Sequence, residues 1–360
     1  MANLREVARQ AGVSVATASR VANGSFAVAP ATRDRVERAM RELLYVPAGH
    51  RSETGLIGIL VPELANPIFP ALAQAIETRA APDGLASILC NTGEAALREV
   101  DYVHMLLDRR VEGMIFISSE MTNLRGAHGH YLQLVDEGAK LVFVNGAIPA
   151  IDVPSVGVDE RAAGEIATQH LLDLGHERIG FVAGLEHYLP TQLKAAGRAS
   201  ALSAVGIDPA GLTAHADFST EGGGSALEKL LDLPEPPTGV ICSSDMMAIG
   251  ALHAAYRRGI RVPDELSIIG FDGIDATNWT VPELTTVEQP IAQIADTAVQ
   301  TLQTLIDQPE RALPSSYFRP VLRVRASTAP PHARNRTSAP SRTTAVPAVT
   351  SSSTSTAPRR

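Results

Sequence analysis

Short runs of β-branched and aliphatic residues alternate with amphipathic stretches along most of the chain, and residues 160–174 form one of the latter. Runs that are apolar at consecutive positions are typical of strands buried on both faces, which occur in parallel sheets covered by helices. The pattern therefore predicts an α/β body of parallel sheets flanked by helices. The runs of strand length lie at 57–61, 86–90, 113–118 and 141–144, and then at 178–183, 239–243 and 266–272.

The repetition of this pattern in two halves predicts a body of two lobes. We expect lobe 1 to comprise about 57–157 and 288–314, and lobe 2 to comprise about 158–287 and 315–325. Ligands of open α/β sheets collect beyond the carboxyl ends of the strands, so the cleft between the lobes is the expected small-molecule site.

The first 46 residues differ, because their apolar residues recur at helical spacing. Two short helices around a glycine turn are typical of a helix-turn-helix unit, and a third helix that begins at Pro30 would close a small core. The first helix places Leu4, Val7, Ala8 and Ala11 on one face, the second runs from Val15 to Ala22 behind an N-cap at Ser14, and the third repeats Val36, Ala39, Met40, Leu43 and Leu44.

The composition is that of a folded protein with more than one domain. Of the 360 residues, 45% are hydrophobic, yet no apolar run approaches the roughly 18 residues that a membrane helix needs. The mixed charges of the first residues do not resemble a secretory signal, and Cys90 and Cys242 alone do not indicate a disulfide framework. We therefore expect a cytoplasmic protein.

The net charge of −8 is unevenly distributed. Residues 1–46 carry a net charge of +3, residues 326–360 carry +5, and residues 47–325 carry −16. A small basic module on an acidic body indicates a head that binds a polyanion. In the segment 326–360, Ala, Ser, Thr or Pro occupy 26 of 35 positions without apolar periodicity, which predicts a disordered tail.

The second helix of the head supplies the candidates for base contacts, because its first turns enter the major groove in helix-turn-helix proteins. The guanidinium of Arg20 can donate two hydrogen bonds to guanine, whereas Val15 and Ala16 offer apolar contact, for example to a thymine methyl. Short polar side chains and cations near helix ends suit phosphates, which position the head without reading sequence. We assign that role to Thr17, Ser19, Asn23, Thr32 and Arg33, and Ser14 completes the DNA-binding set.

The string LREVARQAGVSVATASRVANG at residues 4–24 resembles the DNA-binding head of the lactose/galactose repressor (LacI/GalR) family. The resemblance covers nearly everything except the tail. It implies a cytoplasmic transcription regulator, more often a repressor, that forms a dimer or a tetramer and whose body is similar to periplasmic sugar-binding proteins. Further matching segments are ATRDRVERAMRELLYVP at 31–47, LVPELANPIF at 60–69, LLDRRVEGMIFI at 106–117, HLLDLGHERIGFVAG at 170–184, SSDMMAIGAL at 243–252, and IIGFD with LTTVEQP within 268–290.

The resemblance also implies effector-binding residues where the sequence keeps the family's pattern. Phe69 and Phe218 fall where family members stack an aromatic ring on the ligand, and Asp272 falls where a carboxylate accepts ligand hydroxyls. An aromatic face covers the apolar side of a sugar ring and a carboxylate takes two donors, so this set fits a polyol. Each residue has a structural alternative, since Asp272 could stabilise a turn and Phe218 could belong to the core. The further polar candidates are Asn145, Tyr188, Ser244 and Gln289.

Three positions depart from the family's pattern around the ligand. Lys194 stands where many members have a clamping arginine, and a lysine lacks the planar fork that holds a ligand by two hydrogen bonds. Arg198 replaces the usual aromatic residue, and Pro190 stands where a hydroxyl often points into the cleft. These departures leave open whether the effector is a typical neutral sugar.

The linker at 47–56 departs further. Family members usually have a hinge helix here, with a leucine that wedges into the minor groove, but AGHRSETG at 48–55 is shorter and has no apolar wedge. Gly49 and Gly55 also disfavour a helix. The missing wedge predicts weaker operator binding, a blunted effector response or both, unless His50 and Arg51 make compensating backbone contacts.

The sequence indicates no catalytic residue, metal site or cofactor. It contains no glycine-rich phosphate loop with Lys-Ser or Lys-Thr, no G-x-S-x-G motif, and no third ligand near the histidine pair His128 and His130. We therefore expect an effector-responsive DNA-binding regulator whose dimer binds a near-palindromic operator. The alternatives are a small-molecule sensor with impaired DNA binding and, more remotely, an enzyme that acts on a sugar.

Overall fold

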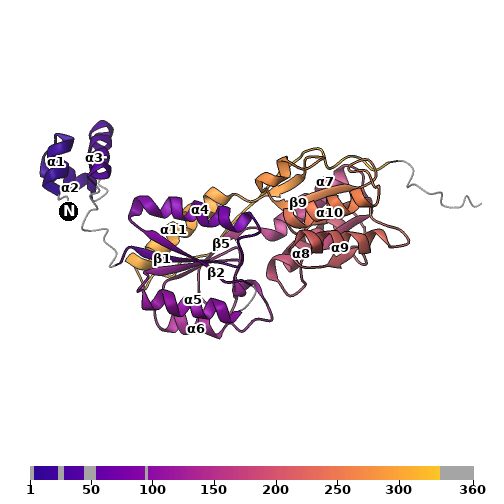
Figure 1. Ribbon diagram of the computed structural model, residues 1–360, viewed down its shortest axis with the longest axis horizontal. Helices are drawn as coiled ribbons and strands as arrows, with labels where there is room; N and C mark the ends of the chain where they lie inside the picture. The colour runs from indigo at the N-terminus through magenta and orange to yellow at the C-terminus, as the bar shows by residue number, and fades with distance from the viewer. Residues whose placement is uncertain (1–3, 23–27, 44–53, 94–95, 333–360) are drawn as a thin grey trace, which may run out of the picture.

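The computed structural model describes residues 4–22, 28–43, 54–93 and 96–332. A small helical unit precedes a body of two lobes, which confirms the expected three-helix head and two-lobed α/β body (Figure 1). Asn23, residues 47–53 and residues 333–360 lie outside the described residues, so the predictions made for them stay predictions. Within the described part of the chain, no helix is long and apolar enough to cross a membrane.

The N-terminal unit packs three helices around a small apolar core: α1 (Leu4–Ala11), α2 (Val15–Ala22) and α3 (Pro30–Glu42). Gly12 has a φ of 65°, and this left-handed conformation lets the chain turn between α1 and α2. Val7, Ala18 and Val36 are buried where the three helices meet. The described apolar positions at helical spacing therefore form the core that the sequence predicts, while Leu44 lies outside the described residues.

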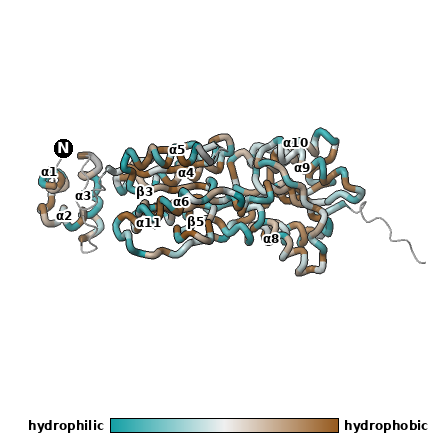
Figure 2. Tube along the Cα trace, turned by 90° about the horizontal axis from the view of Figure 1, so that it is seen from below, coloured by the Kyte–Doolittle hydropathy of each residue, from teal (hydrophilic) through white to brown (hydrophobic). Residues whose placement is uncertain are grey.

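Lobe 1 contains the strands β1 (Leu56–Val61), β2 (Ala86–Asn91), β3 (Gly113–Ile117), β4 (Leu141–Val144), β5 (Ser155–Val158) and β11 (Ser316–Phe318). Its helices are α4 (Ile68–Ala80), α5 (Ala96–Asp108), α6 (Gly129–Asp136) and α11 (Ile291–Asp307), with short 3-10 turns η2 (Ala81–Asp83) and η3 (Glu120–Thr122). The parallel sheet has the order β11-β5-β4-β3-β1-β2, with α4 and α11 on one face and α5 and α6 on the other (Figure 1). Apolar segments run through the inside of the lobe (Figure 2).

Lobe 2 contains the strands β6 (Ile179–Ala183), β7 (Thr213–His215), β8 (Gly239–Cys242), β9 (Ser267–Asp272), β10 (Thr285–Glu288) and β12 (Val321–Arg323). Its helices are α7 (Glu160–Asp173), α8 (Leu189–Ala204), α9 (Thr220–Leu231) and α10 (Asp245–Arg257), with a 3-10 turn η4 (Asp275–Asn278). The sheet order is β12-β10-β9-β8-β6-β7, and only the pairing of β12 with β10 is antiparallel among these strands. Strands β6, β8 and β9 are buried at every position, so both of their faces are covered.

The chain passes between the lobes at residues 158–160, 288–291 and 318–321. The last passage lies later than predicted. The assignment of 315–325 to lobe 2 is wrong for β11, because Ser316, Tyr317 and Phe318 pair with β5 of lobe 1. A three-residue edge strand is too short for its apolar pattern to reveal the sheet that it joins.

Residues 326–332, the C-terminal strap, are ordered against lobe 2, so the predicted start of a disordered tail at 326 is wrong. Ser327 is fully buried, and its Oγ accepts a hydrogen bond from the backbone N–H of Thr285 at 2.9 Å. The Nε2 atom of His176 lies 3.0 Å from the carbonyl oxygen of Ala329. The composition of the segment alone predicted disorder. It could not reveal these hydrogen bonds, because the partners lie far away along the chain.

The end of the linker is anchored to lobe 1. A carboxylate oxygen of Glu112 accepts hydrogen bonds from the backbone N–H groups of Thr54, at 2.9 Å, and Gly55, at 2.7 Å. The hydroxyl of Thr54 donates to the carbonyl of Arg110 at 2.9 Å. The body therefore includes Thr54 and Gly55, which precede the predicted boundary at 57. Local sequence does not reveal this, because Glu112 lies far along the chain.

Candidate DNA-binding surface and interlobe site

The outward face of α2 presents the three residues predicted to contact bases. Val15 is 44% exposed, and Ala16 and Arg20 are exposed as well. Ala18 and Val21 lie on the opposite face and are buried in the core of the head. The outward face of α2 thus presents two apolar groups in its first turn and a guanidinium in its last turn to solvent, which is an arrangement that suits reading of the major groove.

The residues predicted to contact phosphates differ in their surroundings. Ser14 Oγ caps α2 by accepting the backbone N–H of Thr17 at 3.1 Å, and it lies 2.9 Å from Thr17 Oγ1. Both hydroxyls are therefore fixed at the N-terminus of α2, where backbone N–H groups attract anions. Ser19, Thr32 and Arg33 are half-buried, and Ser19 and Arg33 also contact other groups of the protein. Their contacts with DNA stay predictions.

Asn145, Gln289 and Asp272 form a chain of hydrogen bonds that joins the two lobes, and we call it the interlobe relay. Gln289 Nε2 donates to Asp272 Oδ1 at 2.7 Å, while Gln289 Oε1 accepts from Asn145 Nδ2 at 2.7 Å. Asn145 follows β4 of lobe 1, Asp272 ends β9 of lobe 2, and Gln289 follows β10 where the chain crosses between the lobes. Three of the predicted effector residues therefore meet at the carboxyl ends of strands.

The backbone at both ends of the interlobe relay is strained. The φ angles are 55° at Asn145 and 128° at Asp272, values that residues other than glycine adopt at a cost and often at functional sites. Burial, followed by the negative charge of Asp245, raises the pKa of Asp272 well above its ordinary value, although Lys194 and Gln289 act in the opposite direction. A further hydrogen-bond donor that reaches Asp272 would therefore stabilise its ionised form.

Asp245, which the sequence did not single out as a site residue, holds the turn after β9. It is fully buried at the start of α10, and burial raises its pKa to about 6. Its carboxylate accepts hydrogen bonds from the N–H groups of Gly273 at 2.7 Å and Ile274 at 2.9 Å, and from the hydroxyl of Thr286 at 2.6 Å. Asp245 thus performs the turn-stabilising role that was the alternative for Asp272.

The aromatic candidates lie on both lobes. Phe218 and Tyr188 of lobe 2 meet edge to face, with ring centroids 6.1 Å apart. A Cβ atom at residue 184 would lie 2.1 Å from the ring of Phe218, so Gly184 is what allows the ring to lie there. Phe69, near the start of α4 in lobe 1, is half-buried and packs against the core. The part that these rings play in binding an effector stays a prediction.

Three other positions discussed for the effector have structural roles. Ser244 is buried, and its Oγ caps α10 by accepting the N–H of Met247 at 3.2 Å. Pro190 lies in the first turn of α8, a position that suits proline. Arg198 is buried and donates to the carbonyl of Ile179 at 2.6 Å, and burial lowers its pKa to about 10. These side chains support the elements around the site.

Lys194 is buried against a carboxylate that sequence reasoning missed. Its Nζ lies 2.5 Å from Glu160 Oε2 and 3.8 Å from the centroid of the Phe271 ring. The helices α7 and α8 approach closely here, since a Cβ at Gly197 would lie 2.0 Å from a backbone oxygen of α7 and one at Gly164 would lie 2.2 Å from the carbonyl oxygen of Lys194. A glycine in the middle of each helix is the signal that could have predicted this contact.

A second contact between the lobes involves the loop after β3. The backbone N–H of Leu124 donates to the carbonyl of His187 at 2.8 Å, and Asn123 and Tyr188 form an antiparallel bridge. Tyr188 therefore contributes its backbone to the junction of the lobes. A change in the relative position of the lobes would have to break this contact.

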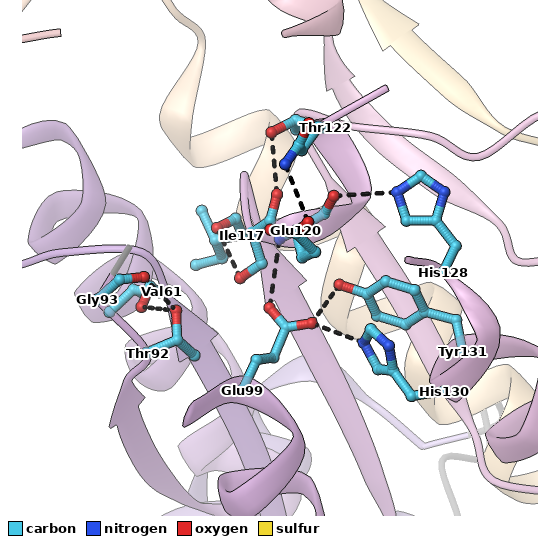
Figure 3. A network of polar contacts seen from close by, with 12 residues as sticks. Val61, Thr92, Gly93, Glu99, Ile117, Glu120, Thr122, His128, His130 and Tyr131 are labelled. Carbon is cyan, nitrogen blue, oxygen red and sulfur yellow. Dashed lines mark hydrogen bonds and ion pairs between the residues drawn. The ribbon is translucent and has the colours of Figure 1, made fainter. Parts of the chain in front are cut away.

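A buried polar network supports that loop from inside lobe 1 (Figure 3). Glu99 Oε2 accepts the backbone N–H of Glu120 at 3.3 Å, and Glu99 Oε1 lies 2.9 Å from His130 Nε2 and accepts the hydroxyl hydrogen of Tyr131. His128 Nε2 lies 3.2 Å from the carbonyl oxygen of Glu120. Both histidines of the pair considered for a metal thus have protein partners, and the described residues contain no group of three ligands that could hold a metal ion.

Comparison with known proteins gives consistent results for the head and the body. Residues 3–48 match the family model "Bacterial regulatory proteins, lacI family", and residues 168–328 match the "Periplasmic binding protein-like domain". A relative from Streptomyces limosus, an uncharacterized HTH-type transcriptional regulator in the aml 5' region, is 40% identical over 332 residues, which are 91% of this chain and 94% of the relative.

Two solved structures are similar over nearly the full length. The transcriptional regulator CelR in complex with cellobiose is 28% identical with a TM-score of 0.70, and the match covers 91% of this chain and 100% of that chain. The lac repressor dimer bound to operator and the anti-inducer ONPF is 26% identical with a TM-score of 0.68, and the match covers 91% of this chain and 99% of that chain.

Proposed function

Because this chain belongs to the LacI family of bacterial regulatory proteins, we propose that it represses genes for the use of a sugar or a related compound. Its dimer binds a near-palindromic operator, and a polyol effector that occupies the interlobe site changes the affinity for that operator. The exposed face of α2, with Val15, Ala16 and Arg20, is the observation that carries the proposal. We assign no catalytic role to the interlobe site.

The head reads sequence through Arg20 and positions itself through the phosphate-contacting residues. A guanidinium on the exposed face of such a helix can reach O6 and N7 of guanine, and each such pair contributes about 1–3 kcal/mol of discrimination. The net charge of +3 on residues 1–46 adds attraction to phosphates that is independent of sequence. Support for this assignment comes from the burial of the opposite face of α2, which fixes its orientation in the head.

The effector binds where the interlobe relay and the aromatic rings lie. Asp272 supplies a carboxylate for hydroxyl donors, and Phe69 and Phe218 supply apolar faces, which is the combination that a polyol ring requires. A ligand hydroxyl that donates to Asp272 competes with Gln289, whose amide also holds Asn145 of lobe 1. Occupancy therefore alters the contact between the lobes, and the head responds to the extent that the effector prefers one arrangement.

A second copy of the chain binds through lobe 2. Trp279 and Val281, two residues apart, are 76% and 96% exposed, and neighbouring apolar side chains this exposed are typical of interaction surfaces. A palindromic operator requires two heads related by a two-fold axis, as in the lac repressor dimer bound to operator. Serine at Trp279 and Val281 should convert the dimer into a monomer in light-scattering measurements, whereas serine at the exposed Leu132 of lobe 1 should not.

Fluorescence anisotropy on duplex DNA tests the function. We expect the full chain to prefer a segment of its own upstream DNA to a shuffled duplex of the same composition by about 10³-fold or more near physiological salt. Equal affinity for both duplexes, with a steep loss as salt rises, would mean that the head binds DNA only through nonspecific attraction to phosphates. That result would support the alternative of a sensor with impaired DNA binding.

A further inference from the structure

The lobe 2 side of the interlobe site holds more buried acid than buried base. Glu160, Asp245 and Asp272 are 7%, 0% and 4% exposed, and Lys194, at 4%, is the buried cation among them. The negative charge of Asp245 and the positive charge of Lys194 both act on Asp272, so these groups form one electrostatic unit. We call the four residues the charged floor of the site.

Lys194 attracts anions only weakly, because its ammonium group is already paired with a carboxylate. Glu160 Oε2 lies 2.5 Å from the ammonium nitrogen, and the ring of Phe271 covers another side at 3.8 Å. A lysine ammonium has three donors and behaves as a point charge, so a buried carboxylate at contact distance cancels most of its field. The other acids of the charged floor are Asp245 and Asp272, and burial raises the pKa of both.

The position of Glu160 is fixed by its helix. It is the first residue of α7, where the helix dipole favours an acidic side chain, and the preceding Asp159 caps the helix by accepting the N–H of Ala162 at 2.9 Å. The close approach of α7 and α8 then holds Glu160 opposite Lys194. The pair is therefore buried between two closely packed helices.

Thr191 adds a neutral group to the same region. It lies in the first turn of α8, one turn before Lys194, and it is 1% exposed. Its hydroxyl has no hydrogen-bond partner within the described part of the chain. A buried hydroxyl without a partner costs free energy that a ligand hydroxyl can recover, so this feature favours a ligand that both donates and accepts hydrogen bonds.

We propose that Glu160 is a specificity-determining residue, which neutralises Lys194 and thereby makes the interlobe site select neutral or amine-bearing polyols and exclude polyols that carry a phosphate or a carboxylate. The inference rests on the proposed effector site. An anionic group at the charged floor would meet the side chains of Asp245 and Asp272 while Glu160 holds Lys194. Arg198, the other buried cation of α8, donates to the carbonyls of Ile179 and Pro209 instead. Burial makes the repulsion stronger than it would be in water. A neutral hydroxyl or an ammonium can donate to Asp272 instead.

Inorganic phosphate is the probe that tests the inference, because it needs no knowledge of the effector. Glu160→Gln keeps the shape of the side chain and removes its charge, which frees Lys194. We expect this variant of the full chain to bind phosphate about 10- to 100-fold more tightly than the wild type, the range that one hydrogen bond to a charged group corresponds to. Calorimetry and thermal shifts measure this, against sodium chloride at equal ionic strength.

The matched control is the double variant Glu160→Gln with Lys194→Met. Phosphate that binds to the basic head affects all three proteins equally, so the double variant should respond to phosphate as the wild type does. The inference is overturned if Glu160→Gln gains nothing over the wild type, or if the double variant keeps the gain.

A second variant covers the case in which Glu160→Gln does not fold. Lys194→Met alone should leave the phosphate response of the chain unchanged, because in the wild type Glu160 already occupies Lys194. A response that disappears in Lys194→Met would show that Lys194 binds anions in the wild type, and the inference would be wrong. The proposed effector site has a separate test. If a polyol still changes the operator binding of the Asp272→Ala variant, that site is assigned wrongly, whatever the phosphate measurements show.

Discussion

The surface of α2 and the interlobe site show two ways to prepare polar groups for a ligand. On α2, Arg20 is exposed to solvent and the structure of the head depends on the opposite face of the helix. In the interlobe site, Asp272 and Gln289 are buried and already hydrogen-bonded to each other. A change on α2 should therefore affect binding alone, whereas a change around the interlobe site should affect stability, the effector response or both.

Asp245→Ala tests the structural side of that contrast and should have the largest effect. The change leaves two backbone N–H groups and a hydroxyl buried without their acceptor, so we expect a loss of about 3 kcal/mol in the free energy of unfolding. Urea unfolding measures it. Asp264→Ala, at an exposed position of lobe 2, should change stability by less than about 0.5 kcal/mol. A similarly small loss for Asp245→Ala would contradict its assigned role.

Asp272→Ala should separate the effector response from DNA binding. Asp245 holds the adjacent turn, so the variant should fold and bind the operator while its affinity for the polyol falls by about 1.5–3 kcal/mol. Calorimetry with the polyol and anisotropy with the operator check the two halves of this expectation. Loss of folding would return Asp272 to the role of a turn-stabilising residue.

Arg20→Ala should weaken operator binding by about 1–3 kcal/mol and relax the choice of base at one position in each half-site. Arg33→Ala, in the same head, should weaken binding to all duplexes evenly and reduce the salt dependence. Neither change should alter folding of the body. Binding to a set of operators with single base substitutions distinguishes the two, and an even loss for both variants would mean that the roles are assigned wrongly.

The smallest expected effect is a loosening of the C-terminal strap at acidic pH. Burial lowers the pKa of His176 and His170 below the ordinary 6.5. As pH falls below 6.5, the unfolded chain takes up protons before the folded one, so stability is complete above this value and declines below it. The protection factors of the amides in 326–332, which correct for the slower intrinsic exchange at acidic pH, should fall between pH 7.5 and 5.5. His176→Gln should reduce the pH dependence, and an unchanged profile would exclude His176 as its source.

The sequence best predicted those elements whose limits are determined by neighbouring residues. The helices of the head begin and end where Ser14, Pro30 and Gly12 indicate, and the central strands lie where consecutive apolar residues require burial on both faces. The family resemblance supplied Asn145, Asp272 and Gln289, but not that they bond to one another. The comparisons confirm the family and the fold, while the roles of these residues remain predictions.

The sequence failed where a residue's partner lies far along the chain. Lys194 could be recognised as a departure from the family, but its pairing with Glu160 depends on the contact between α7 and α8. The strap at 326–332 had the composition of a disordered tail, yet Ser327 is buried against β9 and β10. In each case a tertiary contact outweighed the local composition.

Reciprocal linkage tests most directly whether the interlobe site controls the head. Calorimetry would measure the affinity of the full chain for a polyol that changes operator binding, once with free protein and once with the protein saturated by operator. We expect operator DNA to change the polyol affinity by the same factor by which the polyol changes operator affinity, about 5- to 150-fold. Equal polyol affinity in the presence and absence of operator would contradict this expectation.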